Sequence, residues 1–104
     1  MAQFDVYPVG TMPFGTGIAY LLDIQSDFLD HLSTRIVAPL AYRSHIALPM
    51  TRLNPIFHID GEELVMVTDE IASIPSRALG KSSGNLSSER DAIIAAVDFT
   101  TQGF

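Results

Sequence analysis

The feature that constrains the fold most is a long helical pattern at residues 89–101, which follows a sequence whose apolar runs are all short. Residues 89–101, ERDAIIAAVDFTT, contain no glycine or proline over thirteen positions. Their apolar residues recur at the spacing of a helix, in two stripes. The stripes are Ile93, Ile94 and Val97, and Ala92, Ala95, Ala96 and Phe99. Since the apolar runs upstream are only a few residues long, we predict short strands followed by one C-terminal helix, apolar nearly all round and therefore buried on more than one side.

The predicted start of this helix follows a segment rich in glycine and serine, GKSSGNLSS at residues 80–88, which is typical of a linker. Ser87 or Ser88 can cap the helix through its hydroxyl. Ser88 with Asp91 three residues later matches the capping-box pattern.

Upstream, we predict five to seven short, mostly antiparallel strands. The first, QFDVYPV, alternates Phe4, Val6 and Val9 on one side and ends at Pro8. A glycine-rich loop, VGTMPFGTG, follows. Asp60-Gly61 is a hairpin signal because both residues tolerate a positive φ. The remaining predicted strands are IAYLLDI, RIVAPL with Pro39 confining it to an edge or an end, PIFHI, ELVMV, and TDEIASIP stopped at Pro75.

Length and composition predict one domain that associates with a second copy. A chain of 104 residues holds a single thin core. Hydrophobic residues make up 47% and charged residues 17%, so we expect apolar surface to be covered in at least a dimer. No apolar run approaches the roughly 20 residues that cross a bilayer, no signal-peptide pattern occurs, and there is no cysteine, so we expect a cytoplasmic protein without a membrane segment.

The net charge of −6 opposes direct binding to a phosphate backbone, and we expect none. The final stretch, DFTTQGF, ends on an aromatic residue, Phe104. An ordered tail needs contacts that offset its lost entropy. Phe104 therefore either docks on its own fold or is presented to a partner.

Residues able to do chemistry are present but do not form a recognisable catalytic set. Asp23, Asp27 and Asp30 resemble an acid–base cluster, yet aspartates near strand ends usually bond local backbone amides. A ribonuclease-type trio of Asp30, His31 and Arg35 stays possible from sequence. Four other residues of types that bind metals lie on or beside a predicted hairpin turn, where their side chains would point outward and not converge. They are His58, Asp60, Glu62 and Glu63. We expect no catalytic site, metal or cofactor, and a function in binding another protein.

Several motifs occur in an order that resembles the CcdB family of bacterial toxins, nearly end to end. The most specific is DIQSDFLD, in which Gln-Ser-Asp precedes two bulky apolar residues and an aspartate. The others are QFDVY, RIVAPL, HIDGEEL, TDEIASIP and the ending of a glycine followed by an apolar residue.

This resemblance implies a single toxin domain over residues 1–104 with an SH3-like barrel of mostly antiparallel strands and a C-terminal helix, similar to the Kid and MazF ribonucleases. It implies a homodimer that poisons DNA gyrase by binding its A subunit. A cognate antitoxin, whose disordered tail folds onto the toxin, would neutralise it. The family acts without a catalytic site of its own.

The resemblance also assigns two surfaces. The gyrase-binding residues are Phe28, Leu29, Asp98, Thr101, Gln102, Gly103 and Phe104, and the antitoxin-binding residues are Val9, Gly10, Thr11, Met12, Pro13 and Phe14. Gln102 replaces the tryptophan that usually precedes the final glycine, Thr101 replaces an aromatic residue, and Asp98 replaces a neutral amide. Two alternatives follow: a CcdB-like protein that has lost gyrase poisoning, or an endoribonuclease of the Kid and MazF type.

Overall fold

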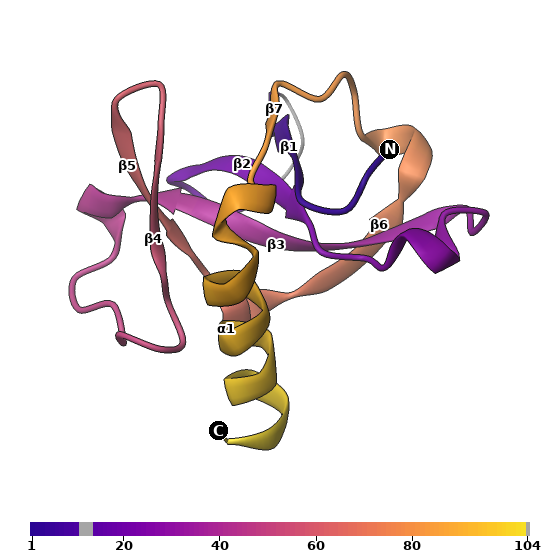
Figure 1. Ribbon diagram of the computed structural model, residues 1–104. Coiled ribbons are helices and arrows are strands. Elements are labelled where there is room, and N and C mark those ends of the chain that lie inside the picture. Colours follow the sequence, from indigo (N-terminus) through magenta and orange to yellow (C-terminus); the bar gives the residue numbers. More distant parts are fainter. Residues whose placement is uncertain (11–13, 104) are drawn as a thin grey trace.

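The computed structural model describes residues 1–10 and 14–103 (Figure 1). Its strands are β1 (Asp5–Pro8), β2 (Ile18–Asp23), β3 (Thr34–Tyr42), β4 (Ile56–Ile59), β5 (Glu62–Met66), β6 (Ala72–Pro75) and β7 (Gly84–Asn85). Five short 3-10 turns, η1 (Asp27–Leu29), η2 (Arg43–His45), η3 (Thr68–Glu70), η4 (Ser76–Ala78) and η5 (Ser87–Glu89), connect them, and α1 (Arg90–Gln102) follows. The prediction of short strands followed by one C-terminal helix is confirmed.

All strand pairs are antiparallel and belong to one curled sheet, a half-barrel, which confirms the predicted fold class. The strand order is β4-β5-β3-β2-β1-β7, and β6 pairs with β3 off this path. The sheet curls so that its two end strands, β4 and β7, both border one small hollow of about 170 Å³. The β4–β5 hairpin lies on the left of Figure 1, η1 on the right, and α1 runs between them and away from the sheet.

The prediction that Pro39 confines its strand to an edge or an end is wrong. The strand β3 is central in the sheet, and Pro39 lies inside it. One side of β3 pairs with β2, and the other side pairs with β6 over Thr34–Val37 and with β5 over Leu40–Tyr42. The Pro39 carbonyl accepts the Val67 amide at 2.9 Å, between those two partners. Since the N–H and C=O of one strand residue face the same side, the amide that proline lacks would point into the interval between the end of β6 pairing at Val37 and the start of β5 pairing at Leu40.

The sheet is covered on both faces, which divides the core in two. On one face Ile93 of α1 packs with Val6, Leu22, Ala38, Leu40, Phe57, Leu64 and Met66. On the other, Tyr7 and Val9 pack with Leu21, Val37 and Leu79. The prediction that Val9 shares a side with Phe4 and Val6 is therefore wrong, since β1 is buried on both faces.

The start of α1 differs from the predicted capping box. The segment before it contains β7, which pairs with β1, so residues 80–88 are more than a linker. The turn η5 then leads into the helix, with Glu89 at its N-cap, and no side chain in the described part of the chain caps it. Instead the Asn85 Oδ1 atom accepts the Ser87 amide at 2.8 Å, because β7 fixes the chain one turn earlier.

The Asp60-Gly61 hairpin is confirmed. Asp60 has φ 51° and Gly61 φ 80°, and they join β4 to β5 with Ile59 opposite Glu62. Two positive φ values are what the mirror-image hairpin turn requires. Within residues 1–10 and 14–103, no helix has both the length and the apolar character needed to span a bilayer.

Candidate functional site

A polar cluster of Asp23, Gln25, Asp30 and Arg35 lies where β2 ends and β3 begins, and all of its members except Asp30 are buried. Arg35 is 1% exposed and Asp23 fully buried. The Arg35 Nε atom donates to Asp23 Oδ2 at 2.8 Å, and Nη1 donates to Asp30 Oδ1 at 2.8 Å. Arg35 Nη2 lies 2.6 Å from Asp23 Oδ2 as an ion-pair contact outside hydrogen-bond geometry. A buried guanidinium therefore meets a carboxylate from β2 and another from the segment after η1.

Gln25 connects this cluster to the backbone of η1. Its amide nitrogen Nε2 donates to the Leu29 carbonyl at 2.9 Å, and its Oε1 accepts the Ile36 amide at 3.0 Å. The Gln25 backbone amide donates to Asp23 Oδ1 at 3.0 Å. The Asp23 contact is the local carboxylate–amide bond that the sequence predicted.

The turn η1 is held at its start as well. The Ser26 hydroxyl oxygen accepts the Phe28 amide at 3.2 Å, and Asp27 Oδ1 accepts the Gln3 amide at 2.9 Å. Asp27 thus bonds a backbone amide from the N-terminal segment, not a neighbouring one. The polar residues of DIQSDFLD all act in fixing one short turn.

Burial raises the pKa of two groups, Asp23 within this cluster and Tyr7 near it. Burial raises the pKa of the Asp23 carboxyl, while the Gln25 amide and the Arg35 guanidinium oppose that rise. Burial, with the nearby Asp5 carboxylate as a smaller cause, raises the pKa of Tyr7 to about 12. A proton on Tyr7 is therefore held firmly, and the phenol is no base at neutral pH.

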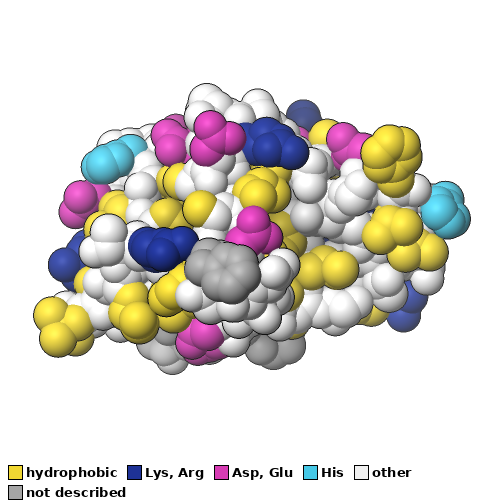
Figure 2. Space-filling model, turned by 60° about the horizontal axis from the view of Figure 1, so that its bottom comes forward, with side chains coloured by type: hydrophobic (Ala, Val, Ile, Leu, Met, Phe, Trp, Pro, Cys, Tyr) yellow, Lys and Arg dark blue, Asp and Glu magenta, His cyan; other side chains and the backbone are white. Residues whose placement is uncertain are grey.

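The side chains that η1 presents to solvent are apolar. Phe28 is 93% exposed and Leu29 is 41% exposed, and Leu32 and Ile36 nearby are also exposed. Hydrophobic side chains gather at the right edge of Figure 2, the side on which η1 lies in Figure 1. Singly exposed apolar residues are common on proteins, but a group of four within nine positions makes this segment a candidate contact surface.

The C-terminal turn of α1 forms a second exposed feature. It projects beyond the sheet in Figure 1 and faces the reader in Figure 2. Gly103 ends the helix with φ 82°, and its amide donates to the Phe99 carbonyl at 2.9 Å, as expected of a left-handed glycine cap. The Arg52 guanidinium carbon lies 4.9 Å from the centre of the Phe99 ring, which ties this end of the helix to the segment before β4.

The two faces of α1 are not equally covered. Ile93 and Ala96 are fully buried, and Ile94 and Val97 are half-buried against the core. Of the second predicted stripe, Ala92 and Ala95 are exposed in the single chain.

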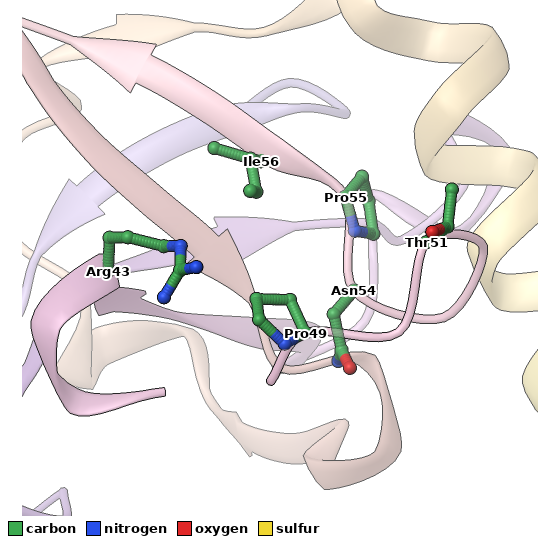
Figure 3. A pocket seen from close by; sticks show the side chains of 6 residues that line it. All are labelled: Arg43, Pro49, Thr51, Asn54, Pro55 and Ile56. Carbon is green, nitrogen blue, oxygen red and sulfur yellow. The ribbon is translucent and has the colours of Figure 1, made fainter. Parts of the chain in front are cut away.

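A hollow of about 350 Å³ opens between η2 and the segment that leads into β4 (Figure 3). Arg43 reaches toward Pro49 and Ile56 across it, and Thr51, Asn54 and Pro55 complete its lining. The Arg43 Nη1 atom donates to the Ile46 carbonyl at 2.7 Å, and Asn54 donates to the Met66 carbonyl at 3.1 Å. Arg43 and Asn54 are thus engaged with the protein itself.

The residues that the sequence offered as catalysts or metal ligands are arranged otherwise. His31 is exposed, while Arg35 is buried and engaged by two carboxylates, so the trio with Asp30 does not open onto a substrate site. His58 Nε2 lies 3.5 Å from Glu63 Oε2 as an exposed cross-strand pair. Among the described residues, no group of three or more ligand-type side chains converges.

The family model described as CcdB protein matches residues 3–103. The chain belongs to the CcdB family. Membership in the CcdB family supports a toxin of a toxin–antitoxin system.

The two parts of the predicted CcdB-type gyrase surface lie apart in the single chain. Phe28 and Leu29 are on η1, and the remaining described positions are at the end of α1, well separated in Figure 1. Asp98, Thr101, Gln102 and Gly103 are all exposed. Phe104 lies outside the described residues.

The predicted CcdB-type antitoxin surface is described only in part. Val9 is 8% exposed and packs in the second core cluster, where half-buried Phe14 also lies, while Gly10 is exposed with φ 61°. Thr11, Met12 and Pro13 lie outside the described residues.

Sequence reasoning missed the roles of Gln25 and Arg35, and the exposure of Leu32 and Ile36. The signal for Gln25 was present in DIQSDFLD, where a polar residue stands directly before a serine cap. Arg35 is the second residue of β3, and only its distance from Asp23 in the fold reveals the pair.

Proposed function

We propose that this chain is a toxin that binds the A subunit of DNA gyrase and traps the enzyme with its DNA strands cleaved. The observation that carries the proposal is the exposed, projecting end of α1, with Asp98, Thr101 and Gln102 on its surface. A rigid helix end with a glycine cap is a suitable element for insertion between parts of a large partner. Phe28 on η1 supplies an apolar contact elsewhere on the surface.

We further propose that the protein acts by binding and not by catalysis. A phosphate-cleaving site needs a cation free to stabilise developing negative charge. Arg35 is the cation nearest to candidate acid–base residues, and it is buried and engaged by Asp23 and Asp30. This arrangement speaks against the endoribonuclease alternative.

The proposal is tested with purified DNA gyrase, supercoiled DNA and the purified chain. We expect the chain to stabilise a cleaved gyrase–DNA complex, revealed as linear DNA after denaturation of the enzyme. Absence of trapped complex at micromolar protein would contradict gyrase poisoning.

The substitution Gln102→Trp sharpens this test, because an aromatic face can stack on a partner or receive an arginine side chain, for about 1–2 kcal/mol. We expect trapping at about tenfold lower protein concentration. Ala92→Trp is the matched control, since it places the same ring on an exposed position at the other end of α1. An equal effect of both changes would mean that the helix end has no special role.

Two partners complete the proposal: a second copy of the chain and a cognate antitoxin whose disordered tail folds onto residues around Val9, Gly10 and Phe14. Gly10 offers open backbone, since none of the described residues lies within 4 Å of a Cβ built there. A peptide from the antitoxin tail should bind the purified chain in calorimetry and abolish trapping. Tight binding without any trapping by the free chain would favour the second candidate described next.

A CcdB-like protein without gyrase poisoning is the second candidate. One observation favours it: the Thr101 hydroxyl donates to the Val97 carbonyl at 3.1 Å, so this side chain is turned back onto its own helix. With Asp98 negative and Gln102 non-aromatic, the described helix end carries no large apolar face. Expression without antitoxin should then leave cells healthy.

A further inference from the structure

We propose that the polar cluster of Asp23, Gln25, Asp30 and Arg35 is a positioning device that holds η1 rigid and keeps Phe28 presented for the protein target. This inference rests on the proposed function, because it gives η1 a role in binding gyrase. It gives the polar residues of DIQSDFLD a shared role, which is to hold this turn in place.

The first step is that η1 cannot hold itself. It has three residues, none of which is buried, and a single 3-10 turn has little intrinsic stability. Its order must therefore come from contacts made by neighbouring side chains. Those contacts are hydrogen bonds: Gln25 to the Leu29 carbonyl at its end and Ser26 to the Phe28 amide at its start.

The second step concerns the direction in which the turn is held. Gln25 bonds Leu29 with its nitrogen and Ile36 of β3 with its oxygen, so one buried amide connects η1 to the central strand. Asp30 bonds Arg35, which also projects from β3. The turn is thus fixed to the most enclosed strand of the sheet at two successive positions, Leu29 and Asp30.

The third step separates a positioning role from simple neutralisation of a buried charge. Asp23 alone neutralises Arg35, with contacts at 2.8 and 2.6 Å. Asp30 is a second carboxylate on the same guanidinium, and its side chain is 55% exposed, so burial of its own charge does not require the partner. What the Asp30 contact adds is a restraint on the segment that follows Phe28.

The fourth step is the state of Phe28 itself. A phenylalanine that is 93% exposed gains almost nothing from its own fold. Held on a rigid turn, the same ring meets a partner without losing further backbone freedom, which is how preorganised aromatic anchors improve binding. A mobile η1 would lose that advantage.

The first experiment measures the rigidity of η1 without any partner. The chain contains no tryptophan, so Phe28→Trp introduces a single indole at this turn. Time-resolved fluorescence anisotropy then reports local motion. We expect mostly slow decay, set by tumbling of the whole protein, and a clear fast component when Asp30→Ala is added. Asp30→Asn should keep the slow decay, since its amide oxygen still accepts from Arg35.

The second experiment measures gyrase binding in chains that retain Phe28. We expect Asp30→Ala to weaken binding to the A subunit of gyrase about tenfold, the effect of one lost restraint near an anchor. Asp30→Asn should stay within about twofold. Asp69→Ala, which removes an exposed aspartate from η3, is the matched control and should change neither readout. Circular dichroism and thermal unfolding establish that each variant is folded.

The outcomes separate this inference from the proposed function. If the unsubstituted chain binds no gyrase, the proposed function fails, and the target-binding role given to the cluster fails with it, while anisotropy still decides whether the cluster orders η1. If gyrase binds but Asp30→Ala changes neither anisotropy nor affinity, the positioning role is wrong and the proposed function stands. If Asp30→Asn is as damaging as Ala, the charge itself acts and positioning is again wrong.

Discussion

At the scale of single residues, Tyr7 shows how burial ties stability to pH. The side chain is 2% exposed, and burial raises its pKa to about 12 from an ordinary value of 10.0. The folded state therefore holds the phenol proton more tightly than the unfolded state does. This contribution to stability is fully present below pH 10 and is lost as pH rises through about 12.

We predict that the free energy of unfolding falls by about 2–3 kcal/mol between pH 10 and pH 12 on account of Tyr7. Urea denaturation at several pH values measures this. The Tyr7→Phe variant should lose less stability over the same interval, because it has no proton to release. Tyr20→Phe is the variant for comparison, because burial raises the pKa of this tyrosine as well. An unchanged pH slope in Tyr7→Phe would contradict the prediction.

Gly17 is a second residue whose identity the fold demands. Its φ is 86°, and a Cβ built there would lie 2.5 Å from Cγ of His45. We predict that Gly17→Ala lowers the free energy of unfolding by about 1–3 kcal/mol, through left-handed strain and the displaced imidazole. In Gly80→Ala, no atom of residues 1–10 and 14–103 lies within 4 Å of the new methyl group, so chemical denaturation should give a nearly unchanged midpoint. Equal midpoints for both variants would count against this reading of Gly17.

At the scale of elements, the end of α1 depends on a contact from outside the helix. Arg52 lies over the Phe99 ring, one turn before the exposed cap at Gly103. A surface cation–π contact is worth about 0.5–1 kcal/mol. The last helical turn is therefore steadied by the segment that also lines the hollow beside Arg43.

We predict that Arg52→Ala speeds hydrogen exchange of the amides near the end of α1 about two- to fivefold, the equivalent of that energy. Arg52→Lys should retain part of the protection, since an ammonium also interacts with an aromatic face. Arg90→Ala removes an exposed arginine at the other end of the same helix and serves as the control. Faster exchange in both variants would point to a general charge effect.

The elements predicted correctly from the sequence are those specified by residues that lie close together along the chain. The Asp60-Gly61 turn needs only two residues with positive φ, and α1 needs only its apolar spacing. The position of Pro39 was predicted wrongly because a central strand tolerates its missing amide only where the pairing partner changes from β6 to β5. The strand β7 was missed because two residues acquire strand geometry from β1, far away in sequence.

The candidate site was predictable to the same extent. Phe28 and Leu29 are adjacent and could not both point inward on a strand, which predicts that one of them is exposed; on η1 both are exposed. The contact between Arg35 and Asp23 depends on the register of β2 against β3, which pairs Asp23 with Val37. A register of that kind is set by the whole sheet, and no local pattern contains it.

At the scale of the whole molecule, apolar surface outside η1 supports association with a second copy. Leu48 is 89% exposed, and Met50 and Ile56 are exposed near it. We predict that light scattering on a sizing column gives twice the monomer mass of 11.3 kDa at micromolar concentration. A constant mass of 11.3 kDa across a hundredfold range of concentration would contradict a homodimer.

The pairing of β7 with β1 has a consequence for the order of events during synthesis. Asp5 faces Asn85, and Val6 faces Gly84, so the first strand made is completed by the last. Ile93, which fills the core face beside Val6, is made later still. The ribosome must therefore release residues 84–93 before β1 and the core face beside it can be completed. Until then one edge of β1 stays without its native partner strand.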